Sequence, residues 1–155
     1  VGTLERFFWH YEIIPIAKYF VEKNYKVIVV TNQSGIERGY YSLFDFYKLS
    51  RYMMNVFLKN DIEIEVRACP HLPEKNCFYR KPNIGMIKEA SKDFNIDIKS
   101  SILIGDEVSD IQAGIAAGVG LNLFFGQKLS TKLNDLPCHV ISTLGEALLF
   151  MDNNC

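Results

Sequence analysis

Short apolar runs alternate along the chain with longer segments in which apolar side chains recur at helical spacing. The runs at 26–30 and 101–104 are continuous and rich in β-branched residues, which is typical of strands buried on both faces of a sheet. Residues 62–68 alternate between apolar and polar side chains as a strand does, and 121–125 and 139–141 read as two further strands. The pattern therefore predicts five strands.

Amphipathic segments separate these strands and predict helices. The first helix is expected to begin near Pro15, since proline is tolerated in a first turn, and to close at Asn24. A second is predicted over 42–59, with Ser42 as N-cap and Asp45 three residues on. Its inner face would carry Leu43, Phe46, Leu49, Met53, Val56 and Phe57.

Further helices are predicted at 84–94, within 106–117 closed by Gly118, and at 144–150. Strands that alternate with helices at this spacing predict an α/β fold, a doubly wound parallel sheet flanked by helices. No internal repeat or linker interrupts residues 1–155, and no stretch between the motifs is long enough for a large cap domain. We expect a single domain.

Composition narrows the class of protein. The 155 residues are 48% hydrophobic and 23% charged, a globular rather than disordered composition. Seventeen basic and eighteen acidic residues give a net charge of −1, which offers no global field for nucleic acid or an anionic membrane. No apolar run reaches the roughly 20 residues of a spanning helix, no signal peptide is visible, and four cysteines are too few for a disulfide-stapled scaffold. These features predict a cytoplasmic protein, by default a monomer.

Polar residues gather where predicted strands end. Thr31, Asn32, Gln33, Ser34 and Gly35 follow the first strand and lead toward Arg38, Arg80-Lys81-Pro82 follows the second, and Gly105 to Asp110 follows the third. Ligands of open parallel sheets bind outside the carboxyl ends of the strands. Each cluster alone could be a turn, a solvated loop or a helix cap. Together their hydroxyls, cations and carboxylates suit a phosphate ester and Mg²⁺.

These clusters resemble the motifs of the haloacid dehalogenase-like phosphatases. Val29-Val30-Thr31-Asn32 is similar to the second motif, Lys81 to the third, and Gly105-Asp106-x-x-x-Asp110 to the fourth. Thr-Asn-Gln-Ser-Gly-Ile-x-Arg-Gly at 31–39, with Cys-Pro-His at 69–71 and Arg-Lys-Pro, resembles one branch more closely. That branch contains heptose bisphosphate phosphatases and histidinol-phosphate phosphatases, and the likeness spans nearly the whole chain.

The resemblance implies hydrolysis of a small phosphate monoester through an aspartyl-phosphate intermediate. Thr31 and Asn32 would contact the transferring phosphoryl group, and Lys81 would neutralise its charge. Asp106 would help to ligate Mg²⁺, and Asp110 would brace that site.

The same resemblance places other polar residues against the substrate. Gln33, Ser34, Arg38 and Arg80 would face its distal phosphate or polar body. Glu107 stands where heptose bisphosphatases commonly carry Lys, so the local charge balance differs from the pattern of the branch.

The nucleophile of the family is not among the 155 residues. Family members open with an apolar strand that ends in Asp-x-Asp-Gly, whereas no Asp occurs here before Asp45, which falls in a predicted helix. In this fold the strand is central, and leaving its neighbours' backbone groups buried and unpaired would cost about 1–3 kcal/mol each. We therefore expect such a segment to precede Val1. The alternative is a non-catalytic homologue that binds phosphate.

A second departure concerns zinc. The branch often carries Cys-x-His followed by Cys-x-Cys before Arg-Lys-Pro, which supplies four ligands for structural Zn²⁺. Here Cys69, His71 and Cys77 are present, but Tyr79 occupies the fourth position. The fourth place would need water, a carboxylate such as Glu74, or nothing. A loop held by packing alone is the competing interpretation.

The substrate favoured at this point is a phosphorylated sugar, D-glycero-D-manno-heptose 1,7-bisphosphate, in the pathway to nucleotide-activated heptose. Its second phosphate would be attracted by Arg38 and Arg80, whereas the cationic amine of histidinol phosphate would be repelled by them. Histidinol phosphate remains the alternative within the same class of enzyme.

Overall fold

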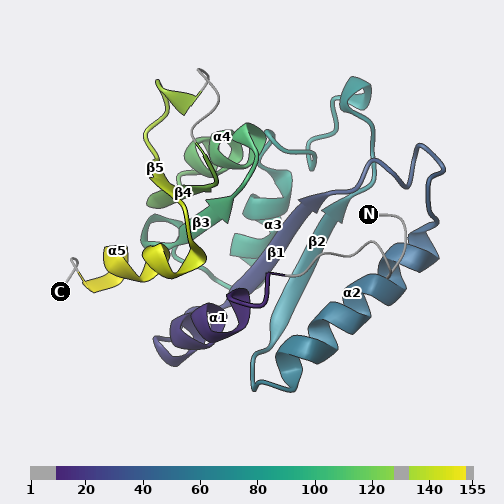
Figure 1. Cartoon of the computed structure of the whole chain (residues 1–155). Coiled ribbons are helices and arrows are strands. Elements are labelled where there is room, and N and C mark those ends of the chain that lie inside the picture. Colours follow the sequence, from purple (N-terminus) through teal and green to yellow (C-terminus); the bar gives the residue numbers. More distant parts are fainter. Residues whose placement is uncertain (1–9, 128–132, 153–155) are drawn as a thin grey trace. The chain divides into compact units, whose positions relative to one another are not determined.

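The computed structural model describes residues 10–127 and 133–152 (Figure 1). The chain divides into two compact units, one ending at Cys77 and the other beginning at Phe78. Both are built from parallel strands and helices, so the predicted α/β class is confirmed.

The first unit is a β-α-β arrangement preceded by a helix. It comprises α1 (Ile13–Glu22), β1 (Val27–Asn32), α2 (Leu43–Leu58) and β2 (Ile64–Cys69). The two strands pair in parallel, with Val27 opposite Ile64 and Asn32 opposite Cys69. Their carboxyl ends therefore lie at one edge of the sheet.

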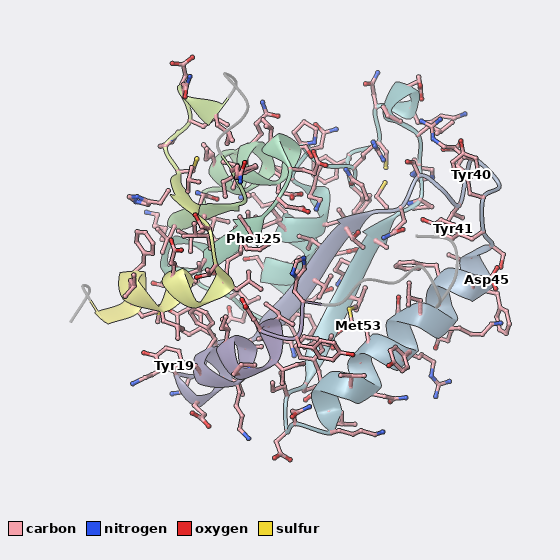
Figure 2. All side chains as sticks on the ribbon, in the orientation of Figure 1. Tyr19, Tyr40, Tyr41, Asp45, Met53 and Phe125 are labelled. Carbon is pink, nitrogen blue, oxygen red and sulfur yellow. The ribbon has the colours of Figure 1, made fainter. Side chains whose placement is uncertain are left out.

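One apolar cluster holds α1, α2 and the sheet together. Ala17 of α1, Phe57 of α2 and Ile64 of β2 are buried in it, together with Ile62. Met53 packs against the same cluster from the side of α2 that faces the strands (Figure 2).

The end of α1 and the start of α2 carry the capping residues that the sequence predicts. Asn24 follows α1 with a left-handed backbone (φ 66°). At the start of α2 the Ser42 hydroxyl accepts from the Asp45 amide at 3.0 Å, and the Asp45 carboxylate accepts from the Ser42 amide at 3.1 Å. This reciprocal capping box satisfies two amides that a helix start leaves without intrahelical partners.

The second unit is a three-stranded parallel sheet in the order β3-β4-β5. Its strands are β3 (Ile102–Gly105), β4 (Leu121–Phe125) and β5 (His139–Ile141). The α-helices are α3 (Gly85–Asp93), α4 (Val108–Ala117) and α5 (Leu149–Asp152), and short 3-10 turns span Pro73–Lys75 in the first unit and Ile98–Ser100 and Leu144–Leu148 in the second.

The central strand and the helix after β3 carry much of this core. Leu123 of β4 and Ile111 of α4 have no exposed surface, and Leu103 of β3 is also buried. Gly118 closes α4 with φ 88°, in the left-handed region where a side chain would be strained.

Three expectations from the sequence are wrong. The apolar run of β1 is half-buried at every position rather than buried on both faces, and among the described residues its sheet partner is β2. Leu43, placed on the inner face of α2, is 64% exposed at the first residue of the helix. The last predicted helix is a 3-10 helix over Leu144–Leu148 before it becomes α-helical.

Candidate active site

A loop that is held by several backbone hydrogen bonds follows the carboxyl end of β1. Thr31 and Asn32 are the last residues of the strand, and the Gln33 amide donates to the carbonyl of Cys69 at 2.7 Å. That bond ties the start of the loop to the end of β2. Backbone bonds from Arg38 to Ser34 (3.0 Å) and from Tyr40 to Gly35 (2.9 Å) then fold the loop back on itself.

Side-chain hydrogen bonds order the first residues of this loop. The Gln33 amide group (Nε2) donates to Oγ1 of Thr31 at 3.0 Å, and the hydroxyl of Tyr41 donates to Oε1 of Gln33. A Cβ on Gly35 would lie 2.3 Å from Cε1 of Tyr41, so only glycine lets this ring lie against the loop. Burial raises the pKa of Tyr41 above its ordinary 10.0, which keeps its hydroxyl protonated.

The remaining loop residues proposed for substrate contact differ in exposure. Ser34 is half-buried, whereas Arg38 is exposed. Glu37, next to Arg38, binds the loop that follows β2: its carboxylate accepts from the Leu72 amide and lies 3.8 Å from the Lys75 ammonium. The two loops that leave this edge of the sheet are thus joined to each other.

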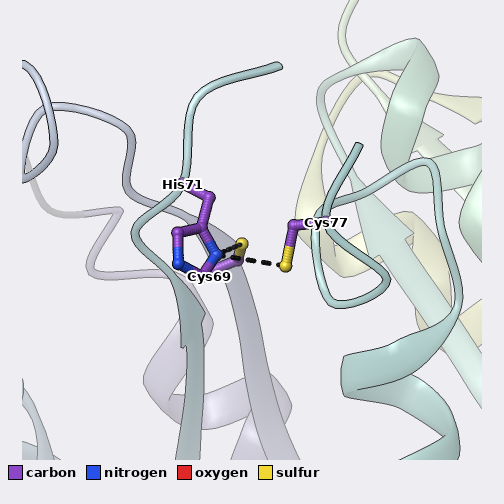
Figure 3. Close-up of side chains that lie close together, drawn as sticks. All are labelled: Cys69, His71 and Cys77. Atoms are coloured by element: carbon purple, nitrogen blue, oxygen red, sulfur yellow. Dashed lines mark hydrogen bonds between the residues drawn. The ribbon is translucent and has the colours of Figure 1, made fainter. Parts of the chain in front are cut away.

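Three metal-ligating side chains meet in the second of these loops (Figure 3). The Nδ1 atom of His71 lies 3.7 Å from Sγ of Cys69 and 3.1 Å from Sγ of Cys77, and all three ligand atoms lie within 4.8 Å of one another. Cys69 is buried at the end of β2, whereas His71 is exposed. Tyr79, at the position of the fourth ligand in the motif, is 41% exposed.

In the second unit, a buried ion pair lies beyond β3. Nζ of Lys81 is 2.6 Å from Oδ1 of Asp110, and both side chains are only 10% exposed. The other oxygen of Asp110 accepts from the Glu107 amide at 3.0 Å, within a capping box that starts α4. One carboxylate therefore caps the helix and holds the lysine.

Gly105 makes room for this carboxylate. A Cβ at Gly105 would lie 2.3 Å from Cβ of Asp110, so the last residue of β3 has to be glycine for Asp110 to lie against the strand end. Asp106, the next residue, is exposed, as is Glu107, whose side chain serves the capping box. An N-cap role accounts for an acidic residue at position 107.

The Lys81 loop closes on itself within the same unit. The Gly85 amide donates to the carbonyl of Phe78 at 3.0 Å, and the Asn83 amide donates to the carbonyl of Arg80 at 2.8 Å. Arg80 is half-buried beside Lys81. The loop thereby presents a second cation next to the paired lysine.

The predicted residues thus form three groups. Thr31 and Gln33 are hydrogen-bonded to each other, the two cysteines and His71 meet in the metal-ligand cluster, and Lys81 pairs with Asp110. The participation of Tyr41 was not foreseen. The sequence pattern gave no signal for it, and its neighbour Tyr40 is 73% exposed.

Comparison with known proteins identifies the family of this chain. The profile of the polynucleotide kinase 3 phosphatase family matches residues 4–133, which is most of the chain. The chain belongs to the haloacid dehalogenase-like phosphatases. The family match covers the end of β1, the Lys81 loop and the start of α4, which are the parts that carry the polar clusters.

Several curated relatives are similar to this chain in sequence. A D-glycero-alpha-D-manno-heptose-1,7-bisphosphate 7-phosphatase of Campylobacter jejuni is 48% identical over 109 residues, covering 70% of this chain and 62% of the relative. One of Burkholderia mallei is 38% identical over 97% of this chain and 84% of its own length. A beta-heptose enzyme of Helicobacter pylori is 39% identical over 89% of this chain and 81% of its own length.

Solved structures confirm the fold. The D,D-heptose 1,7-bisphosphate phosphatase of B. bronchiseptica, complexed with magnesium and phosphate, superposes with a TM-score of 0.88 at 20% identity, covering all of this chain and 89% of that one. A HAD-like phosphatase of Mesorhizobium loti gives 0.76 at 26% identity, covering 96% of this chain and 76% of that one. Among the helices of the described residues, none is long and apolar enough to cross a bilayer.

Proposed function

We propose that the protein is a Mg²⁺-dependent phosphatase that hydrolyses D-glycero-D-manno-heptose 1,7-bisphosphate. The observation that carries this proposal is the buried Lys81–Asp110 pair, directly after a strand end, within a chain that belongs to a phosphatase family. The names of the relatives supply the substrate, since three of them at 38–48% identity are heptose-1,7-bisphosphate 7-phosphatases.

The residues of this chain suit the charge that moves during phosphoryl transfer. The ammonium of Lys81 stabilises negative charge on the phosphoryl oxygens, and Asp110 holds that ammonium in place. In the first unit, the Thr31 hydroxyl and the Asn32 amide at the end of β1 are neutral donors of the kind that suits phosphoryl oxygens. Because Asp110 is fixed by the Glu107 amide as well, the lysine is oriented before the substrate binds.

An aspartyl-phosphate route also requires a carboxylate that attacks phosphorus and a second that transfers the proton of the leaving group. No Asp precedes Asp45 in the 155 residues, and Asp45 is engaged in the exposed cap of α2. We assign neither of these two roles to a residue of this chain.

Magnesium fits the donor chemistry at the end of β3. The exposed carboxylate of Asp106 follows the strand directly, and Mg²⁺ takes one or two protein carboxylates together with substrate phosphate and water. Asp106 would hold the ion, and Asp110 would support it from the helix start. The bound ion would neutralise charge on the phosphate.

The substrate side of the proposal rests on residues that follow the strand ends. Arg38 in the first unit and Arg80 in the second are each a cation suited to a phosphate, and Gln33 and Ser34 are polar groups suited to a sugar. A bisphosphate is attracted by both arginines, whereas the amine of histidinol phosphate is repelled by them.

Structural zinc is proposed for the metal-ligand cluster. Tetrahedral Zn²⁺ with ordinary bond lengths places a sulfur and a nitrogen ligand about 3.5 Å apart. The observed distances of 3.7 Å and 3.1 Å from His71 Nδ1 bracket that value. Water or the carboxylate of Glu74, which is exposed in the same loop, would complete the set.

The test is phosphate release by the whole protein, as its gene encodes it, from a panel of esters in the presence of Mg²⁺. The panel holds both anomers of heptose 1,7-bisphosphate, histidinol phosphate and a 3′-phosphorylated oligonucleotide. We expect the highest kcat/KM for one heptose bisphosphate, with release of the 7-phosphate. A higher value for histidinol phosphate or the oligonucleotide would overturn the substrate, and no release from any ester would overturn the activity.

A further inference from the structure

The hydrogen bonds that connect Tyr41, Gln33 and Thr31 run in a fixed direction. The Tyr41 hydroxyl donates to the carbonyl oxygen of the Gln33 side chain, and the Gln33 amide nitrogen donates to the Thr31 hydroxyl oxygen. Each group in this series donates toward Thr31. All three residues lie within the first unit: Thr31 near the end of β1, Gln33 directly after β1, and Tyr41, labelled in Figure 2, shortly before α2.

The direction matters because a side-chain amide can bind a hydroxyl in two ways. With its nitrogen toward Thr31, Gln33 occupies a lone pair of the threonine oxygen and leaves the threonine proton available. With its oxygen toward Thr31, Gln33 would accept that proton itself. A phosphoryl oxygen can only accept, so only the first arrangement lets Thr31 donate to it.

The structure shows the first arrangement, and Tyr41 takes part in it. Its hydroxyl donates to the carbonyl oxygen of Gln33, while the amide nitrogen of Gln33 faces Thr31. The ring is held for this purpose against Gly35, where a side chain would collide with it. In the described part of the chain, the Gln33 side chain is hydrogen-bonded to both the Thr31 and the Tyr41 hydroxyl.

We propose that Tyr41 is a positioning residue that locks the amide of Gln33 so that the Thr31 hydroxyl donates to the phosphoryl group. The inference rests on the proposed phosphatase function. It adds that Gln33 acts on Thr31, rather than only on the substrate, and that position 41 sets how fully Thr31 is oriented.

A double-mutant cycle of Tyr41→Phe and Gln33→Ala in the whole protein separates this role from a structural one. Tyr41→Phe removes the donor and keeps the ring against Gly35. We expect it to lower kcat about 5–10-fold with KM changed less than 2-fold, the scale of one neutral hydrogen bond. In the Gln33→Ala background the same substitution should change kcat less than 2-fold, because the residue through which Tyr41 acts is gone.

The matched control is Tyr40→Phe, which removes the same atom from a neighbouring tyrosine that is 73% exposed. It should leave kcat unchanged. If Tyr41→Phe lowered kcat equally in both backgrounds, or only raised KM, the positioning role would be wrong.

A readout without turnover keeps the inference testable if the proposed activity fails. The side-chain amide protons of Gln33 can be followed by nitrogen-15 NMR. We expect the proton bonded to Thr31 to exchange with water more than 5-fold faster in Thr31→Val and in Tyr41→Phe, but at the native rate in Thr31→Ser and Tyr40→Phe. Native exchange in Tyr41→Phe would show that Tyr41 does not hold the amide.

Discussion

Two helices of this protein begin with the same device in different surroundings. Both α2 and α4 start with a capping box, Ser42 with Asp45 in the first unit and Glu107 with Asp110 in the second. The Asp45 side chain is 47% exposed and lies 3.6 Å from Lys48 on the surface. The Asp110 side chain is 10% exposed and lies 2.6 Å from Lys81.

The comparison shows that a helix-capping carboxylate can also hold a cation of the candidate site when it is buried. An exposed carboxylate is solvated whether or not it pairs, so the Asp45–Lys48 contact adds little. A buried carboxylate without its partner is strongly unfavourable, so Asp110 and Lys81 depend on each other. The same cap thus serves only the helix in one unit, and in the other it also fixes a cation for the proposed chemistry.

The largest effect is expected from Lys81→Met in the whole protein. Removing the ammonium leaves Asp110 buried and unpaired, which should lower the free energy of unfolding by about 3–5 kcal/mol, and it removes charge stabilisation worth about 100–1,000-fold in kcat. Urea unfolding and steady-state kinetics measure the two. Lys88→Met, an exposed lysine of α3, is the control and should change neither.

A smaller effect is expected from Thr31→Val, which replaces the hydroxyl by a methyl group at the end of β1. Loss of one donor to the phosphoryl group should lower kcat about 10–100-fold, whereas stability should change by about 1 kcal/mol or less, because the group is neutral and half-buried. Thr31→Ser should keep most of the activity. A loss of stability comparable to that of Lys81→Met would contradict the contrast between the two units.

The metal-ligand cluster should affect stability more than chemistry. We expect about one zinc ion per chain by elemental analysis of protein purified without chelator, because three donors with suitable spacing are in place. Cys77→Ser should lose the ion, lower Tm by about 4–8 °C and leave kcat within about 3-fold. Cys138→Ser, a cysteine outside the cluster, should retain it. If the native protein contained no zinc, the interpretation of this segment as a loop held by packing alone would be correct.

The smallest effect concerns the exposed cap. The Ser42 hydroxyl and amide lower the pKa of Asp45, so its ionised form is favoured by folding. Its contribution is present above the ordinary pKa of 3.8 and is lost as the pH falls through the lower folded value. Asp45→Asn should therefore lower Tm slightly at pH 7, and the difference from the native protein should disappear as the pH falls through the lowered pKa of Asp45. A difference that persists at low pH would contradict this account, and Glu63→Gln, an exposed control, should show none.

The sequence predicted the ends of the helices better than it predicted the burial of the strands. Ser42, Asn24 and Gly118 mark helix ends because capping is local chemistry, and all three act where expected. The half-burial of β1 was not predicted, because an apolar run alone does not show how much neighbouring structure covers the strand.

The candidate site shows the same contrast: motif residues could be predicted, but their burial and contacts could not. Lys81 and Asp110 could be proposed from their motif, but their burial and the double use of the Asp110 carboxylate follow from packing against Gly105. Tyr41 could not be found from the pattern, since hydrogen bonding of a tyrosine to a loop residue has no periodicity. Its neighbour Tyr40 has the same local sequence signal and a different environment.

The most direct test of the central claim is kcat/KM for D-glycero-D-manno-heptose 1,7-bisphosphate, measured for the whole protein beside Lys81→Met and Lys88→Met. The account predicts turnover by the native protein and by Lys88→Met, and a loss of at least about 100-fold in Lys81→Met. Turnover of this substrate by Lys81→Met at the native rate, in folded protein, would contradict it.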